Sequence, residues 1–292
     1  MSKKAVVVGG SGFLGSHVAD CLSDNGFRVT IYDYSESRWL RDDQDIVIGD
    51  ILDTDALEKA IAGAKIVYNF AALADLNQAL NNPIETVKIN ILGNLNVLEA
   101  CRIHNVERFI YASTVYVQSR EGGFYKCSKK SSESYVEEYQ KLYGLDYTIL
   151  RYGSLYGPRA DATNGIYRII SSALRTGTVR YKGSAEAIRE YIHIHDASLA
   201  SVAILEDSFE NETIILTGQE SLRVIDLVKM VAEILNLPHD SVEFIEGDYS
   251  GHYVRTPYAY EQKTARKYIP SSHIDLGQGL LQTISSIDNV QS

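Results

Sequence analysis

The chain has 292 residues, of which 45% are hydrophobic, and a formal net charge of -10 at pH 7. This length and composition allow one large domain or two modest ones, each with a real core. The acidic balance argues against nucleic acid or an anionic membrane surface as the main partner. An anionic metabolite could still bind, but it would need a few well-placed basic side chains.

The cysteines and the first residues bear on the compartment. Cys21, Cys101 and Cys127 are widely spaced and show no CxxC pattern. This usage predicts a reducing compartment without a disulfide framework or a zinc site. The chain passes from Met-Ser-Lys-Lys directly into Ala5, with no signal-like region and no apolar run of about 18 residues. We therefore predict a soluble, cytoplasmic protein with no membrane partner.

The first 150 residues alternate short β-branched runs with amphipathic stretches, a pattern typical of βαβ units in a parallel sheet. The predicted strands are Ala5–Gly9, Val29–Asp33, Asp45–Ile48, Ile66–Phe70, Arg108–Ala112 and Tyr147–Tyr152. The predicted helices are Gly12–Asn25, Thr54–Ala62, Pro83–Asn105 and Lys126–Tyr143. The sequence thus predicts an α/β fold with a doubly wound parallel sheet of the Rossmann type.

The regular alternation stops after Gly157-Pro158-Arg159. The later predicted elements are a helix near Ile166–Thr176, strands near Arg189–Ile194 and Thr213–Leu216, and a helix over Ile225–Leu235. We interpret residues 1–160 as a dinucleotide-binding domain. Residues 161–292 are interpreted as a smaller, discontinuous substrate lobe at the carboxyl edge of the sheet, with some segments returning to it.

A glycine-rich turn, Gly9-Gly10-Ser11-Gly12-Phe13-Leu14-Gly15, joins the first predicted strand to the first helix. Glycines there let the backbone approach a pyrophosphate, which the N–H groups and the positive dipole end of the helix can hold. Asp33 ends the next strand, 18 positions past Gly15. A carboxylate at that place accepts hydrogen bonds from ribose hydroxyls and repels a 2′-phosphate. The pair predicts an NAD site rather than an NADP site.

Tyr125 and Lys129 are spaced to lie on one helix face, one turn apart. A phenol is a poor base at neutral pH, but a nearby ammonium favours the phenolate. With 20 tyrosines in the chain, such a pair is expected by chance. It becomes informative because it follows the strand that ends in Ser113-Thr114, at the carboxyl edge of the predicted sheet.

Together these residues resemble the extended short-chain dehydrogenase/reductase family, in its NAD-dependent epimerase/dehydratase branch. The similar motifs are the GxxGxxG of Gly9, Gly12 and Gly15, Gly49-Asp50-Ile51-Leu52-Asp53, Asn69-Phe70-Ala71-Ala72, Asn90, Ser113-Thr114, Tyr125/Lys129, Arg151–Arg159 and Arg189–Asp196. The resemblance implies a cofactor site of Gly9, Gly12, Phe13, Leu14, Gly15, Asp33, Asp50, Ile51, Ala71, Ala72, Asn90, Tyr125, Lys129 and Tyr152. It also implies a nucleotide-diphosphate sugar held by Ser154, Arg189 and Arg255, and a homodimer formed by the helices over 83–105 and 126–143.

The same resemblance implies epimerisation of a nucleotide-linked sugar through a transient 4-keto intermediate. In that scheme Tyr125 is the acid/base, Lys129 tunes it, and Thr114 or Ser113 hydrogen-bonds the reacting oxygen. The family's 4,6-dehydratases carry Asp-Glu directly after the hydroxyl residue, where this chain has Val115-Tyr116. A 4,6-dehydratase, an NAD-dependent reductase or dehydrogenase, and a non-catalytic NAD-sensing protein remain as alternatives.

Three features leave details open. Only ten residues separate Thr114 from Tyr125, fewer than is usual in the family. Counting from the strand selects Thr114 as the hydroxyl position, whereas aligning Val115-Tyr116 on the family's VYG would select Ala112; we prefer the strand, because loops absorb deletions more easily than strands do. Ser154 replaces the family's usual Asn. His193-x-His195-Asp196 has side chains on alternate positions, but no third and fourth ligands accompany it, so no metal site is predicted.

Overall fold

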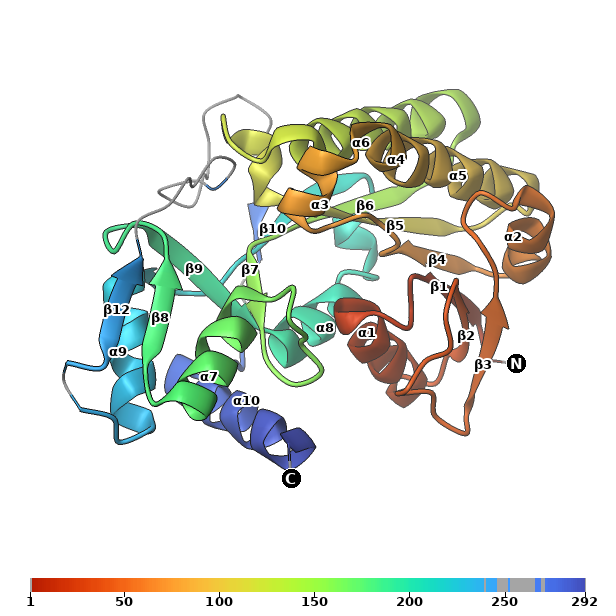
Figure 1. The fold of residues 1–292 in the computed structure, drawn as a ribbon. Helices are drawn as coiled ribbons and strands as arrows, with labels where there is room; N and C mark the ends of the chain where they lie inside the picture. Colours follow the sequence, from red (N-terminus) through yellow and green to blue (C-terminus); the bar gives the residue numbers. More distant parts are fainter. Residues whose placement is uncertain (1, 239, 246–251, 253–265, 269–270, 292) are drawn as a thin grey trace.

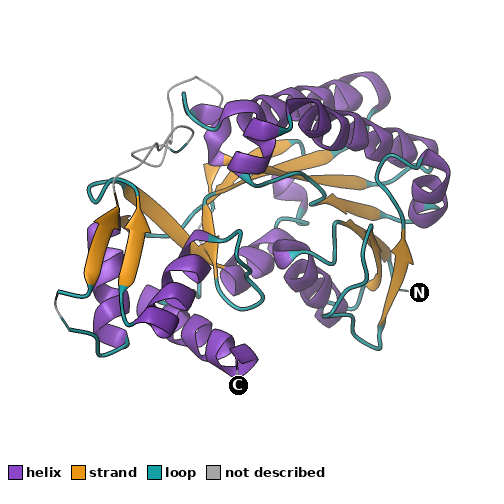
Figure 2. Cartoon of the chain, in the orientation of Figure 1, coloured by secondary structure: helices purple, strands orange, loops and turns teal. Residues whose placement is uncertain are grey.

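The central feature of the protein is a parallel sheet with helices on both faces (Figures 1 and 2). A computed structural model describes residues 2–238, 240–245, 252, 266–268 and 271–291. The eight strands lie in the spatial order β13-β10-β6-β5-β4-β1-β2-β3, and all neighbours pair in parallel. Their bounds are β1 Lys4–Val8, β2 Arg28–Asp33, β3 Gln44–Ile48, β4 Ile66–Asn69, β5 Arg108–Thr114, β6 Tyr147–Tyr152, β10 Glu212–Leu216 and β13 Arg266–Lys267. The predicted doubly wound fold is confirmed.

Each face of the sheet has its own core, because successive strand residues point to opposite sides. Val7 packs in the cluster shared with α1 (Phe13–Asp24) and α8 (Ile194–Ala203). Val6 and Val8 pack in the opposite cluster, under α2, α5 and α6. These three helices cover Thr54–Ile61, Asn94–Ile103 and Gly123–Tyr143. The near-continuous apolar strands of the sequence follow from this double coverage.

The strand order reverses between β1 and β4. From β1 the chain builds outward to β2 and β3, and from β4 it builds in the other direction to β5 and β6. The loops after the carboxyl ends of β1 and β4 therefore diverge and leave a crevice, the position where open α/β sheets bind ligands. The glycine-rich turn follows β1 at this point, as predicted.

The long helix predicted over Pro83–Asn105 is not uniform. It consists of α4 (Pro83–Val87), a π-helical stretch over Lys88–Gly93, and α5. Asn90 lies in the π-helical stretch, and its amide bonds the backbone of Leu73. Such π-bulges often occur at functional sites, and a sequence pattern of period 3.6 does not reveal them. A short helix before it, α3 (Leu76–Asn81), was not predicted.

The part of the chain after Gly153 forms a smaller second core. Its elements are the three-stranded sheet of β7 (Ser154–Tyr156), β9 (Ile188–His193) and β11 (Ser221–Arg223), the pair β8 (Val179–Lys182) and β12 (Val242–Ile245), and helices α7 (Gly165–Thr176), α9 (Val224–Ile234) and α10 (Leu276–Gln291). Helix α8 and strands β10 and β13 instead belong to the main sheet and its cover. The domain division after residue 160 stays a prediction.

None of the described helices has the length and hydropathy that a bilayer crossing requires.

Tyr68 ties β4 to α8 and offers a test of this packing. Its buried hydroxyl donates a 2.7 Å hydrogen bond to the carbonyl of Ser201, in the last helical turn, where carbonyls lack helical partners. Tyr68→Phe should lower the free energy of unfolding in urea by about 1–3 kcal/mol, because the carbonyl is left buried and unpaired. Tyr143→Phe, at a position 55% exposed, is the matched control and should change it by less than about 0.5 kcal/mol. Equal effects of the two variants would contradict the assignment.

Candidate active site

The glycine-rich turn brings three backbone segments so close together that side chains cannot fit. A Cβ on Gly15 would lie 2.2 Å from the Gly9 carbonyl oxygen. A Cβ on Gly9, which has φ +79°, would lie 2.5 Å from the Ala71 nitrogen. The glycines thus let the start of α1 and the loop after β4 close on the end of β1.

The N-terminus of α1 opens onto a cavity of about 510 Å³. Its N-cap residue, Gly12, has no side chain to accept from the first N–H groups of the helix. These donors and the helix dipole suit a bound pyrophosphate. The residues lining this cavity include Gly9, Gly12, Asp33, Asp50, Ile51, Ala71 and Ala72. The geometry therefore fits a dinucleotide cofactor, and these seven of the predicted cofactor residues come together in one cavity.

Asp33 is buried at the end of β2, and its carboxylate already orders the turn. One oxygen accepts from the Ser11 N–H at 2.9 Å, and the other accepts from the N–H and hydroxyl of Ser35 at 3.1 and 3.2 Å. Each carboxylate oxygen can accept more than one hydrogen bond. Asp33 can therefore hold the turn and still face a ribose at the cavity wall.

Asn90, Phe13, Leu14 and Tyr152, also predicted to bind the cofactor, do not line this cavity. Asn90 holds the loop after β4 by two hydrogen bonds to the backbone of Leu73, and it donates a third to the Ser128 hydroxyl on α6. Phe13 lines the neighbouring cavity, and Leu14 packs on the core. The Tyr152 hydroxyl bonds Ser201 on α8 at 2.6 Å, so its polar end points into the core.

Tyr125, Lys129 and Thr114 meet at the carboxyl end of β5. The Thr114 side chain lies close enough to the Tyr125 hydroxyl to lower the pKa of the phenol. The Lys129 ammonium lies 5.9 Å from the centre of the Tyr125 ring and donates a 2.8 Å bond to the Ala112 carbonyl. Because β5 extends to Thr114, two residues beyond the predicted end, the threonine is still held in the strand.

Burial dominates the protonation of both groups. Desolvation raises the pKa of Tyr125 to about 12, against a smaller lowering by the Thr114 hydrogen bond. Desolvation also lowers the pKa of Lys129 to about 7, and Glu133 opposes this lowering. Tyr125 is a neutral phenol at pH 7 in this state. Added positive charge beside it would be needed to make it a base.

Ser113 belongs to a separate, buried cluster. Its hydroxyl donates a 2.6 Å hydrogen bond to Glu133, which also accepts two bonds from the Arg151 guanidinium at 2.9 and 2.7 Å. The ion pair is almost completely inaccessible to solvent. Ser113 thus faces the ion pair, whereas Thr114 faces Tyr125, which supports Thr114 as the hydroxyl that would contact a reacting oxygen.

A second cavity, of about 590 Å³, lies beside the first. Phe13, adjacent to Gly12 of the first cavity, lines it together with Thr114, Ser154 and the largely buried Arg189. The predicted Arg255 lies outside the described residues. A cavity that combines the hydroxyl of Thr114 with a guanidinium suits a phosphorylated, hydroxyl-bearing ligand.

Residues not predicted from the sequence also line this cavity. Arg168 on α7 adds a second cation, and the Tyr116 hydroxyl bonds His252 Nδ1 at 2.9 Å. Burial, with Arg189 and Arg168 nearby, lowers the pKa of His252. Tyr116 lies two positions after Thr114 in the chain, so its proximity to this cavity could have been inferred. Arg168 and His252 gave no such local signal.

Comparisons with known proteins agree with this geometry. The sequence model of the NAD dependent epimerase/dehydratase family matches residues 5–217. A solved UDP-glucose 4-epimerase from Thermotoga maritima, in complex with UDP-glucose, superposes with a TM-score of 0.88 at 25% identity, covering 99% of this chain and 100% of that one. A UDP-N-acetylglucosamine 4-epimerase from Methanobrevibacter ruminantium gives 0.84 at 25% identity, covering 99% of each. A UDP-N-acetyl-alpha-D-glucosaminuronate decarboxylase of Bacillus cytotoxicus is 28% identical over 91% of this chain and 89% of its own length.

The pKa of Lys129 predicts a dependence of stability on pH. The folded state releases the lysine proton near pH 7, whereas an unfolded lysine keeps it to about 10.4, so the unfolded state binds more protons between these values. The free energy of unfolding of the cofactor-free protein should therefore contain a contribution that rises with pH, by up to about 1.4 kcal/mol per pH unit. Lys129→Met should remove this rise in urea titrations between pH 7 and 10.

Lys141→Met is the control, because Lys141 is exposed and its pairing with Glu138 raises its pKa. It should not remove the rise. A wild-type protein whose difference from Lys129→Met is flat across this window would contradict the buried, neutral lysine.

Proposed function

This chain belongs to the NAD-dependent epimerase/dehydratase family, and we propose that it inverts C4 of the sugar in a nucleotide-diphosphate sugar. Its cofactor is NAD. The observation that carries the proposal is the position of Tyr125 beside Thr114 at the end of β5, because Thr114 lines the second cavity, which adjoins the dinucleotide cavity at Gly12 and Phe13. A substrate in the second cavity would present a sugar hydroxyl to both residues.

The proposed NAD contacts follow the first cavity. The turn of Gly9, Gly12, Phe13, Leu14 and Gly15 would hold the pyrophosphate, Asp33 the adenosine ribose, and Asp50 and Ile51 the adenine side. Ala71, Ala72, Asn90 and Tyr152 would support the nicotinamide half together with Tyr125 and Lys129. When bound, NAD supplies reversible storage for the hydride of the sugar carbon.

The proton is handled by the chain. Tyr125 takes the proton of the C4 hydroxyl and returns it after the keto-sugar has rotated in the cavity to present its other face. Its ligand-free pKa of about 12 must fall for this, and the Lys129 ammonium is the protein's own nearby cation. Glu133 favours the charged form of Lys129, because an opposite charge raises the pKa of an amine. Thr114 donates a hydrogen bond to the reacting oxygen.

The substrate would be held by its diphosphate. Arg189 offers a planar guanidinium with several donors to phosphate oxygens, and Ser154 lines the same cavity. Arg168 supplies a further cation at the wall. We assign Arg255 the same role from its place in the sequence. These few cations let a protein of net charge -10 bind an anionic sugar nucleotide.

Epimerisation is preferred to the other reactions of the family because of the residues after Thr114. Dehydration and decarboxylation in related enzymes employ an acid near this place, and here Val115 and Tyr116 follow. The relatives include a decarboxylase, so the choice rests on these two positions rather than on overall similarity. Asp33 disfavours NADP, the cofactor that many keto-sugar reductases of this family prefer.

We further propose that the chain forms a homodimer. Exposed apolar side chains gather on α4, on the π-helical stretch after it and on α6; they are Ile84, Val87, Leu92, Phe124, Tyr135 and Leu142. Such a set on adjacent helices favours burial against a second copy. The cytoplasmic location stays a prediction.

The reaction can be followed by NMR of the anomeric and C4 signals in a panel of UDP-hexoses and UDP-N-acetylhexosamines. We expect interconversion of one pair of C4 epimers without net NADH production. Tyr125→Phe should reduce kcat by about 10²–10⁴-fold, because only the proton-transferring hydroxyl is lost. Tyr143→Phe, at an exposed position on the same helix, should leave kcat within about twofold. A panel without any interconversion, with NAD bound, would contradict the proposal.

A further inference from the structure

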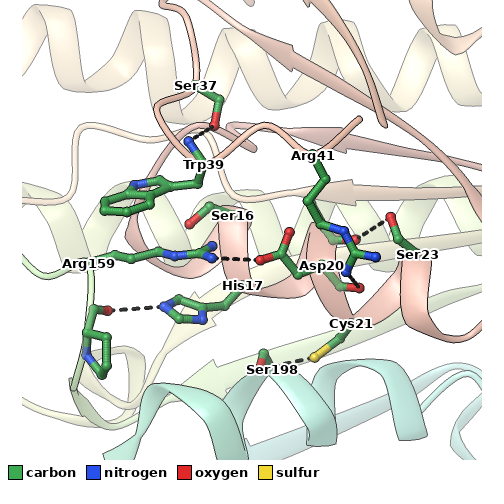
Figure 3. A network of polar contacts seen from close by, with 12 residues as sticks. Ser16, His17, Asp20, Cys21, Ser23, Ser37, Trp39, Arg41, Arg159 and Ser198 are labelled. Carbon is green, nitrogen blue, oxygen red and sulfur yellow. Dashed lines mark hydrogen bonds and ion pairs between the residues drawn. The ribbon is translucent and has the colours of Figure 1, made fainter. Parts of the chain in front are cut away.

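A network of polar contacts joins α1, the loop after β2 and the turn over residues 157–164 (Figure 3). Its centre is Arg159, whose Nη2 donates a 2.7 Å hydrogen bond to Asp20 on α1. The guanidinium carbon also lies 4.9 Å from the centre of the Trp39 ring. A cation placed over an indole face is attracted to it. Arg159 therefore contacts two segments that lie more than 100 positions away in the chain.

The backbone at this place supports a specific role for the side chain. Arg159 has φ +67°, a left-handed conformation that side chains other than glycine rarely adopt. The preceding carbonyl, of Pro158, accepts a 3.1 Å hydrogen bond from Nε2 of His17, one helical turn before Asp20. Burial lowers the pKa of His17 to about 4, so the ring is neutral at pH 7 and Nε2 carries the proton. Contacts on both sides hold the turn in this conformation.

One end of the network reaches the cofactor cavity. The Asp33 carboxylate binds Ser11 of the glycine-rich turn and Ser35, and the Ser11 hydroxyl donates to the Ser35 carbonyl at 2.9 Å. Two residues further, the Ser37 hydroxyl accepts from the Trp39 N–H. The loop that presents Trp39 to Arg159 is thus the same loop that the proposed ribose-binding Asp33 orders.

The other end reaches the second cavity. The turn that begins at Gly157 continues into Asp161, Thr163 and Asn164, all of which line that cavity. Asp161 accepts two hydrogen bonds from Thr163, and Asn164 caps α7, so the turn is ordered as far as the cavity wall. A movement of this wall would be transmitted to Arg159 through five residues of ordered backbone.

We propose that Arg159 is a positioning residue that couples the substrate cavity to the adenosine side of the cofactor site, through Trp39 and Asp20. The proposal rests on the proposed function for the identity of the ligand, a nucleoside diphosphate. Filling the second cavity shifts the 157–164 turn, and Arg159 carries this shift to the loop of Trp39. Loss of the Arg159 side chain separates the two sites and weakens substrate binding.

Trp39 is the only tryptophan of the chain, so its emission reports on this contact without labelling. The NAD-loaded enzyme is titrated with UDP, and binding is measured in parallel by calorimetry. We expect the emission of Trp39 to change in intensity or wavelength and to saturate with the calorimetric Kd. In Arg159→Gly the emission should no longer respond, although UDP still binds at higher concentration.

Arg159→Gly is chosen because glycine accepts the left-handed backbone, so the loss is that of the side chain. Its KM for the sugar nucleotide should rise about fivefold or more, a typical coupling between sites, while kcat changes by less than about twofold. Trp39→Ala should also raise KM. Arg38→Met is the control: Arg38 is an exposed cation in the same loop, outside the network of Figure 3, and its loss should leave the response and KM unchanged.

The outcomes separate this inference from the proposed function. UDP binding with a silent Trp39 in the wild type, or a full emission response in Arg159→Gly, overturns the coupling alone. A KM in Arg159→Gly equal to that of the wild type overturns it as well. Failure of UDP to bind at all contradicts the proposed substrate class, and the role of Arg159 in holding that substrate falls with it.

Discussion

The hydrogen bond from Lys129 to the Ala112 carbonyl joins α6 to β5, and the arrangement of the site depends on it. It fixes the rotation of the helix so that Tyr125, one turn earlier, meets Thr114 two residues further along the strand. The bond places the Lys129 amine 5.9 Å from the centre of the Tyr125 ring, in a desolvated position. Glu133, on the same helix and paired with Arg151, opposes part of this effect of burial on Lys129. The packing of α6 on β5 therefore also sets the positions of the acid/base residues.

The second constraint is the close approach of backbones at the glycine-rich turn. It sets the start of α1 against β1 and the loop after β4, at the point where the strand order reverses. The two cavities adjoin because Gly12 and Phe13, consecutive residues, each line one of them. A cofactor and a substrate bound there would meet at the end of β5.

What could be predicted from the sequence followed from local interactions. The β1 strand, the turn and α1 are adjacent in the chain, and their glycine spacing has a direct steric meaning. The π-helical stretch at Asn90 could not be predicted, because it occurs together with a hydrogen bond between Asn90 and Leu73, which lies in a different segment of the chain. The contacts of Arg159 could not be predicted either, because its partners Asp20 and Trp39 come from distant segments. The Ser113 hydroxyl faces Glu133 only because β5 and α6 pack together.

In the proposed reaction, the hydride taken from C4 of the sugar returns to the same carbon. UDP-glucose and its C4 epimer, each carrying deuterium at C4, can be incubated with the enzyme and analysed by mass spectrometry and NMR. We predict complete retention of the label at C4 in the epimerised product and no labelled NADH in solution. Deuterium found at another carbon, in solvent or in released NADH would contradict epimerisation and indicate a dehydratase, an exchange or a one-way dehydrogenase.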